Sequence, residues 1–325
     1  MEQVNDIDFE KYRETLDIRN KVKEKAEFRS SLSEYFKQRK LGVVGDRLPF
    51  RTGQKEFGFD KSQVTLWAGI NGHGKSMITG YAALGFMRQG KKVFIASLEM
   101  TGVSTVARMA NQAIGKKDLS DRDLDRFCDW RNDQLFIYDH TGTIDPWQVI
   151  AFCRFAKIEL EVDHIIIDNF SKCLRSDTDL DSQKDLINQI TEVAKELNVH
   201  IHVVDHARKG QSEEDQIGKF DIRGSGAKLD LVDNIFIVQR NVRKERIIRE
   251  GGLCNEADVS FTCAKNRHGE FQGRFIPLWF DRGTYKYFEA TPSEFDDFIT
   301  DDFINSVAIP KHEPVKPFYE VDGAY

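Results

Sequence analysis

Cysteines are few, and long apolar runs are missing. The 325 residues include 5 cysteines, none in a CxxC spacing, which argues against a disulfide framework and a zinc ribbon and fits a reducing compartment. No run of about 18 apolar residues occurs, so we expect no helical membrane span. The first residues lack the apolar core of a secretory signal peptide. We therefore expect a cytoplasmic protein.

An excess of positive charge is also missing. The chain has 47 Lys and Arg against 53 Asp and Glu, a formal net charge of -6. Proteins that coat nucleic acid without sequence preference are usually basic, because contacts to phosphates supply most of their affinity. We therefore expect this chain to bind DNA or RNA only through a local patch or a channel.

Patterns of apolar and charged residues divide the chain into three parts. Residues 1–44 are predicted as an N-terminal helical linker, because 6–40 contain no Gly or Pro and carry apolar residues at near-helical spacing. This apolar stripe is thin, so it packs either on its own domain or on a neighbouring copy. Residues 45–290 are predicted as one domain. Residues 291–325 combine four prolines with an acidic cluster, which is typical of a poorly ordered tail.

Within 45–290, short apolar runs alternate with helical patterns, which predicts an α/β fold with a mostly parallel sheet covered on both faces. From residue 257 the predicted strands follow each other closely, with turns at GEFQG and DRG, so we expect an antiparallel C-terminal extension. The predicted parallel strands are 63–69, 92–98, 134–140, 164–170, 200–206 and 234–240, and the predicted helices are 75–89, 102–114, 146–159 and 183–197.

A phosphate-binding loop follows the first predicted strand. Residues 69–76 read GINGHGKS and match GxxxxGK[ST], in which glycines let successive backbone N–H groups face a phosphate. Lys75 is expected to reach the β- and γ-phosphates, and Ser76 to bind Mg²⁺. A Gly-rich turn that happens to carry Lys and Ser is the alternative. The predicted nucleotide-binding residues are Gly69, Asn71, Gly72, His73, Gly74, Lys75 and Ser76.

Three further polar residues lie at or just after the ends of predicted strands, where α/β sheets bind ligands. Asp168 ends HIIID and is expected to hold a Mg²⁺-bound water, although it can also cap a turn. Glu99 follows KVFIASL as a candidate base for the attacking water, or as a surface acid. His206 ends HIHVVDH, where it either contacts the γ-phosphate or is structural. The histidines show no metal-ligand spacing, so we expect no zinc.

In chain order, these motifs resemble the RecA-fold motor domain of hexameric replicative helicases of the DnaB type, and most of all the helicase half of phage primase-helicases. The resemblance spans about residues 45–290 and implies a RecA-like P-loop NTPase core that uses Mg²⁺ and ATP, or another NTP or dNTP, in a bacterial or phage-infected cell. The segments that carry it are GINGHGKS, SLEM, IIIDNF, VVDHARKG, DIRGSGAKLDLVDNIFIVQRN and AKNRHGEFQG.

The resemblance also implies roles for individual residues at the nucleotide. Glu99 matches the acid that polarises the attacking water, and His206 falls at the sensor position. Arg240 and Phe280 fall where relatives sandwich the nucleotide base, and a strand-edge Arg with a core Phe is the alternative.

Two cations are implied to act on a neighbouring subunit. Arg267 in KNRHG matches the arginine finger, whose guanidinium stabilises charge on the transferred phosphoryl group of the nucleotide held next door. Lys265 reaches across the same interface in relatives. A surface arginine in a hairpin turn is the alternative for Arg267. The helix predicted at 6–40 sits where relatives keep the linker helix that docks on the neighbouring subunit, so the resemblance implies a ring, six or seven subunits being compatible.

DNA contact in the family comes from two loops that face the centre of the ring. The first is here SKCLRSDTDLDSQ (171–183), whose acidic character puts direct contact in doubt. The second runs over 207–226 and suits tracking of the DNA backbone without base readout, or is a mobile surface loop. The predicted DNA-binding residues are Arg208, Lys209, Lys219, Arg223, Gly224 and Gly226.

The function expected from this resemblance is an NTP-driven hexameric DNA helicase that moves 5′ to 3′ on single-stranded DNA during replication. Primase and collar domains are not expected, since only about 45 residues precede the motor. A primase, polymerase or loader is then a partner, through the tail or the N-terminal helix. The alternatives are a nucleotide-binding loader or regulator of a helicase, and a RecA-like recombination or repair ATPase.

Overall fold

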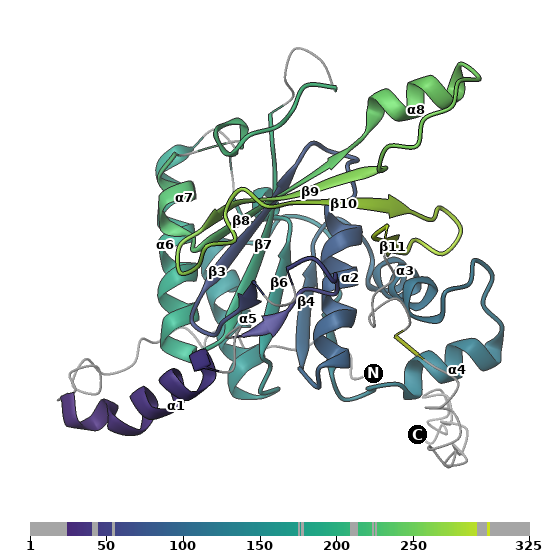
Figure 1. Ribbon diagram of the computed structural model, residues 1–325. Helices are drawn as coiled ribbons and strands as arrows, with labels where there is room; N and C mark the ends of the chain where they lie inside the picture. The colour runs from purple at the N-terminus through teal and green to yellow at the C-terminus, as the bar shows by residue number, and fades with distance from the viewer. Residues whose placement is uncertain are drawn as a thin grey trace, which may run out of the picture.

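The computed structural model describes residues 25–40, 45–53, 56–174, 176, 179–208, 214–222, 224, 226–290 and 298–299. Within these residues one sheet holds nine strands, in the order β11–β10–β9–β8–β3–β7–β6–β4–β5 (Figure 1). The parallel strands are β3 (Val64–Gly69), β4 (Val93–Ser97), β5 (Leu135–Tyr138), β6 (His164–Asp168), β7 (His200–His206) and β8 (Asn234–Arg240). The antiparallel strands are β9 (Val259–Asn266), β10 (Phe275–Phe280) and β11 (Tyr287–Phe288).

Helices cover both faces of the parallel strands, as the near-continuous apolar runs predicted. On one face, α2 (Lys75–Arg88) and α3 (Gly102–Ile114) pack with a cluster of aromatic residues that includes Trp67. On the other face, α5 (Pro146–Ile158) and α6 (Leu180–Leu197) pack around Phe152. The mixed α/β fold, the mostly parallel sheet and the antiparallel extension are therefore confirmed.

The remaining elements are short or polar. They are η3 (Lys25–Phe28), α1 (Arg29–Lys40), β1 (Asp46–Arg47), β2 (Gly58–Phe59), α4 (Asp121–Asp129), η4 (Phe170–Cys173), η5 (Lys219–Asp221), α7 (Gly226–Leu231) and α8 (Val242–Arg249). Of the segment predicted as helical over 6–40, residues 25–40 are helical. Residues 1–24 and most of the predicted tail lie outside the described residues.

Two predicted boundaries are wrong for a local reason. The strand predicted over 164–170 ends at Asp168, because the Asn169 side chain accepts a hydrogen bond from Lys172 N and begins η4. The loop predicted over 171–183 ends early, because Asp179 caps α6 through Ser182 N (3.0 Å) and the helix begins at Leu180. Both changes follow from short polar side chains that compete for backbone N–H groups.

The register of the sheet brings several polar strand ends to one edge. Ser97 on β4 lies opposite Asp168 on β6, and Asp168 lies opposite Val204 on β7. Gly69 on β3 lies opposite His206. Since ligands of open α/β sheets bind outside the carboxyl ends of the strands, this edge is where a site is expected.

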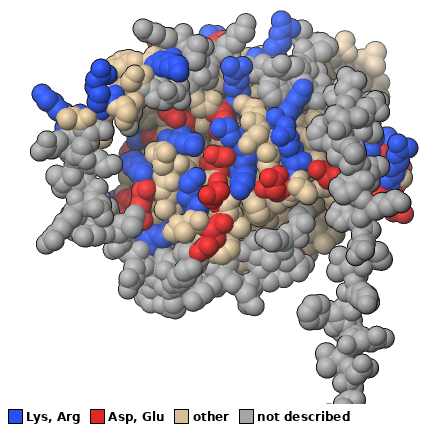
Figure 2. Space-filling model, turned by 90° about the horizontal axis from the view of Figure 1, so that it is seen from below, with Lys and Arg blue, Asp and Glu red and all other residues tan. Residues whose placement is uncertain are grey.

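The face of the molecule seen from below shows basic and acidic side chains interspersed, with no separate patch of one sign among the residues described there (Figure 2). Acidic and basic residues also pair just before the first residues of the parallel strands. Examples are Lys61–Asp163 (3.5 Å) and Lys92–Glu161 (3.8 Å). Such a face is a poor track for nucleic acid. In the described part of the chain, the helices are too short or too polar to cross a membrane.

Candidate active site

The phosphate-binding loop joins β3 to α2. Gly72 (φ 80°) and Gly74 (φ 87°) adopt left-handed backbone conformations that favour glycine, and Gly74 caps α2. A Cβ at Gly69 would collide with the Val238 carbonyl oxygen on β8. The buried Lys75 Nζ donates to the carbonyl oxygens of Gly69 (3.0 Å) and Ile70 (3.1 Å), so the amine lies over the loop. The loop therefore brings its backbone and the Lys75 amine together at the place predicted for a phosphate.

Ser76 and Asp168 meet beside this loop and hydrogen-bond to each other. Burial raises the pKa of Asp168 to about 6, and the bond from Ser76 and the charge of Lys75 oppose this rise. A hydroxyl and a carboxylate are the hard oxygen donors that Mg²⁺ prefers. A cavity of about 20 Å³, room for about one water, borders both residues. The pair therefore fits the predicted Mg²⁺ site.

Asn169 joins two of the predicted catalytic residues, and sequence reasoning missed it. Its Oδ1 accepts from Ser171 Oγ (2.6 Å) and Lys172 N (3.2 Å), which orients the amide. Its Nδ2 donates to Glu99 Oε1 and lies 2.9 Å from His206 Nε2. The only signal in the sequence was its position directly after Asp168 in HIIIDNF.

His206 lies close to both Glu99 and Lys75. Glu99 Oε1 is 3.6 Å from His206 Nε2, and His206 Nδ1 is 3.1 Å from Lys75 Nζ. A hydrogen bond from His206 lowers the pKa of Glu99, and Asn169 and Lys75 lower it further, against a rise caused by burial. Glu99 is therefore ionised near neutral pH, as a base must be.

A cavity of about 390 Å³ opens beside the phosphate-binding loop and is lined by the two residues predicted to hold the base. Arg240 Nη1 donates to Gly72 O (3.4 Å), and the Phe280 ring lies 5.1 Å from that of Tyr287 in the same cavity. Glu245 on α8 pairs with Arg240 (3.2 Å). Sequence reasoning missed Tyr287 and Glu245 as site residues. Tyr287 lies in the strand predicted at TYKYFE (284–289), which carries no motif, and the charged helix α8 was not predicted.

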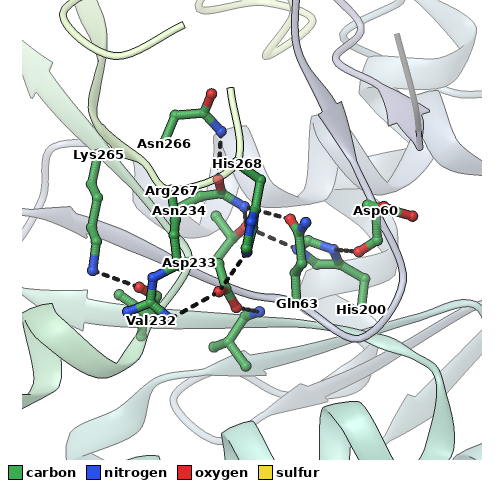
Figure 3. Close-up of polar contacts among 12 residues, drawn as sticks. Asp60, Gln63, His200, Val232, Asp233, Asn234, Lys265, Asn266, Arg267 and His268 are labelled. Atoms are coloured by element: carbon green, nitrogen blue, oxygen red, sulfur yellow. Dashed lines mark hydrogen bonds and ion pairs between the residues drawn. The ribbon is translucent and has the colours of Figure 1, made fainter. Parts of the chain in front are cut away.

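Lys265 and Arg267 lie away from this site, at the opposite end of the sheet. Asn266 pairs with Asn234 at the start of β8, whereas Arg240 is at its far end, six residues or roughly 20 Å along the strand. Figure 3 shows both cations turned toward Val232 and Asp233, which directly follow α7. Lys265 Nζ donates to the carbonyl oxygens of Leu229 (2.6 Å), Val232 (2.7 Å) and Asp230 (3.1 Å). Arg267 Nη2 donates to Asp230 O and Nη1 to the Asp233 carboxylate (3.2 Å).

Two of the residues predicted to contact DNA, Arg208 and Lys219, lie in the described parts of the second loop. Arg208 is exposed, and its N–H donates to Asp221 O (2.6 Å). Lys219 lies over the ring of Phe220 (4.9 Å), a side chain that is 81% exposed. Aromatic and cationic side chains of this kind suit stacked bases and phosphates of a single strand.

The other predicted DNA contacts are less informative. At Gly224 the backbone φ is 96°, a left-handed conformation that favours glycine, so the local backbone already accounts for a glycine there. Gly226 is exposed at the start of α7. Lys209 and Arg223 lie outside the described residues.

Comparison with known proteins decides the family. Residues 52–289 match the DnaB-like helicase C-terminal domain family. The chain belongs to this family. This confirms the DnaB-type resemblance seen in the motifs.

A curated relative of this DnaB-like chain is the DNA helicase/primase of Enterobacteria phage T3, which is 27% identical over 203 residues. The match covers 55% of this chain and 35% of the relative, so the chain spans about a third of that protein's length.

Two solved structures share the DnaB-like fold. One is a DnaB-like replicative helicase studied with its interactions with primase (TM-score 0.67, 16% identity), covering 82% of this chain and 67% of that one. The other is a structure described as an ATPase domain (TM-score 0.66, 16% identity), covering 81% of this chain and 99% of that one. At this identity they support the RecA-like fold alone.

Proposed function

We propose that this chain is the NTP-driven motor of a replicative DNA helicase, which moves 5′ to 3′ on single-stranded DNA as a hexameric ring. The observation that carries the proposal is the convergence of Lys75, Asp168, Glu99 and His206 at one edge of the sheet, in a member of the DnaB-like family. The direction of movement and the number of subunits are expectations from the family resemblance.

In this proposal the nucleotide phosphates lie in the loop before α2, against Lys75 and the N-terminal end of the helix. Ser76 would bind Mg²⁺ and Asp168 would hold one of its waters, and the ion would neutralise charge on the phosphates. Glu99, ionised and held by Asn169, takes a proton from the attacking water. Arg240 and Phe280 enclose the base in the cavity beside the loop.

His206 responds to the phosphate because of a conflict among its hydrogen bonds. Lys75 Nζ and Asn169 Nδ2 are both donors, and they face the two ring nitrogens. A neutral imidazole has one acceptor nitrogen, so His206 accepts from one of them at a time. With Lys75 bound to Nδ1, the ring proton is on Nε2 and faces Glu99. A γ-phosphate that draws Lys75 away lets the ring carry its proton on Nδ1 instead, where it donates to the phosphate, while Nε2 accepts from Asn169 and gives up its bond to Glu99.

Arg267 and Lys265 serve the next subunit in this proposal. Both lie at the end of the sheet remote from their own phosphate-binding loop, so they reach a nucleotide only across a subunit interface. The guanidinium would spread over the charge that develops on the transferred phosphoryl group.

Single-stranded DNA is the proposed track, and Arg208 and Lys219 its contacts among the described residues. They bind backbone and stacked bases without reading the sequence. A primase is a proposed partner, since the phage relative is a helicase/primase and one structural neighbour was studied with primase. A polymerase or a loader that binds the tail or the N-terminal helix is part of the same proposal.

The test is NTP hydrolysis with and without single-stranded DNA, with Lys75→Ala as the blank. We expect hydrolysis that needs Mg²⁺, is stimulated by DNA and disappears in the variant. Hydrolysis that ignores DNA would favour the loader or regulator, and the DNA roles of Arg208 and Lys219 would be lost first.

A further inference from the structure

A buried ion pair ties α7 to β7. Lys228 on α7 and Asp205 on β7 have side chains only 2% and 5% exposed, and Lys228 Nζ donates directly to Asp205 Oδ2. The Lys228 amine also lies 5.1 Å from the centre of the Phe170 ring. Burying two charges costs solvation that their attraction rarely exceeds, so such a pair is weak evidence for a purely stabilising role.

The Asp205 end of the pair adjoins the phosphate site. Asp205 directly precedes His206, and its Oδ1 accepts from His206 N (2.7 Å). The next side chain, His206, contacts Lys75 and Asn169. If His206 shifts when it exchanges hydrogen-bond partners, its backbone N–H, which donates to Asp205, would shift with it.

The other end of the connection is the last turn of α7. The carbonyl oxygens of Leu229 and Asp230 accept from Lys265 Nζ, and Asp230 O also accepts from Arg267. Val232 O, just after the helix, accepts from Lys265 Nζ as well (Figure 3). Asp233, two residues beyond α7, accepts from Arg267 and from His268 (both 3.2 Å). Any displacement of α7 is thus transmitted to the two cations that the subunit offers to its neighbour.

We propose that α7, fastened to β7 by the Lys228–Asp205 pair, couples the nucleotide state of a subunit to the position of Lys265 and Arg267. Lys228 and Asp205 are positioning residues: neither lines the cavities beside the phosphate-binding loop. The inference rests on the proposed function, since it assumes that the two cations act in the next subunit.

The test replaces the pair by apolar residues of similar size in the full chain, Asp205→Leu with Lys228→Met. Such replacement often leaves a fold as stable as before. We expect nucleotide affinity and DNA-independent hydrolysis like those of the parent. We expect the cooperativity of hydrolysis in NTP to vanish and the stimulation by single-stranded DNA to fall about five- to tenfold, a usual size for coupling between sites.

The matched control is a second, largely buried pair, Arg154 with Glu196 (3.3 Å), which joins α5 to the C-terminal end of α6. Arg154→Met with Glu196→Leu is expected to leave cooperativity and stimulation unchanged. If the apolar replacement at 205 and 228 does not fold, Asp205→Asn with Lys228→Gln takes its place. It keeps a hydrogen bond without the charges and is expected to lose the same two properties.

Parent-like cooperativity and stimulation in a folded variant would overturn the inference and leave the proposed function standing. A parent protein that shows neither property would overturn the proposed function itself. The two failures are therefore told apart by the parent alone.

Discussion

Asn169 shows how one uncharged residue can organise a charged site. Its amide is oriented by Ser171 and Lys172 and presents Nδ2 to both Glu99 and His206. Without that donor, the carboxylate proposed to face the attacking water loses its fixed orientation. Small misplacements of catalytic groups are costly because the reaction needs an aligned geometry.

Asn169→Ala is therefore expected to lower kcat for NTP hydrolysis by roughly 10- to 100-fold, the effect of about 1–3 kcal/mol. Nucleotide affinity should change little, because Asn169 is not among the predicted contacts of the nucleotide. Steady-state kinetics and equilibrium nucleotide binding separate the two effects. Ser171→Ala is the control, since it removes a bond to Oδ1 but keeps both contacts of Nδ2. Equal losses in the two variants would contradict the role.

The sequence was sufficient to predict two kinds of site residue: those in a local motif, and those at strand ends that meet at one edge of the sheet. Lys75 and Ser76 are set by the GINGHGKS motif, and Asp168, Glu99 and His206 by apolar strands that end at one edge. Asn169 was missed because an amide has no pattern of its own. The DNA roles of Lys209 and Arg223 stay predictions, because these residues lie outside the described part of the chain.

At the scale of elements, the apolar strands were predictable and the polar helices were not. The apolar run NIFIVQR predicted β8 with both of its observed ends, because a short continuous apolar run is typical of a strand buried on both faces. By contrast, α4 (DRDLDRFCD) and α8 (VRKERIIR) bury few residues, so their charged faces hid the helical pattern. The helix α7 has only six residues and follows a glycine-rich segment. Its importance comes from tertiary contacts, which no local pattern reports.

Three adjacent strands, β3, β6 and β7, share a buried chain of polar side chains. Trp67 Nε1 donates to His202 Nδ1 (3.1 Å), so His202 donates through Nε2 to His164 Nδ1 (3.0 Å), and His164 donates through Nε2 to Asp46 (3.0 Å). Each tautomer is fixed by the indole, which can only donate. Burial lowers the pKa of His202 well below its usual range and that of the neighbouring His200 to about 3.

These two histidines predict acid sensitivity. The folded chain keeps both histidines neutral, while the unfolded chain protonates them below about pH 6.5. The stability of the folded state is therefore unaffected by them above that pH and decreases as the pH falls below it. Each lowers the free energy of unfolding by about 1.4 kcal/mol per pH unit below this point. Asp168 opposes the loss, because its raised pKa lets the folded state take up a proton near pH 6. Urea unfolding at pH 7.5, 6 and 5 is expected to show a net loss that is steeper in Asp168→Asn. Equal stability of that variant at all three values would refute the prediction.

At the scale of the whole molecule, the sheet separates the two halves of the proposed reaction. The phosphate-binding loop and Glu99 lie at the carboxyl ends of the parallel strands, and Arg267 lies beside α7 at the other end of β9. A single subunit therefore has one proposed phosphate site and, remote from it, two cations that this site does not reach. A closed ring, in which each interface joins one subunit's loop to the next subunit's arginine, uses both.

Mixing two inactive variants tests this arrangement. Lys75→Ala lacks the phosphate lysine and Arg267→Ala lacks the finger, whose loss alone costs about 10³-fold or more in related reactions. In an equal mixture, an Arg267→Ala subunit supplies an intact loop and its Lys75→Ala neighbour an intact arginine. About a quarter of the interfaces in randomly assembled rings then hold a complete site, so hydrolysis should recover to no more than about a quarter of the parent rate. Lys75→Ala mixed with itself at the same total concentration is the blank. Full activity of either single variant, or no recovery in rings shown to exchange subunits, would mean that the site is not shared between neighbours.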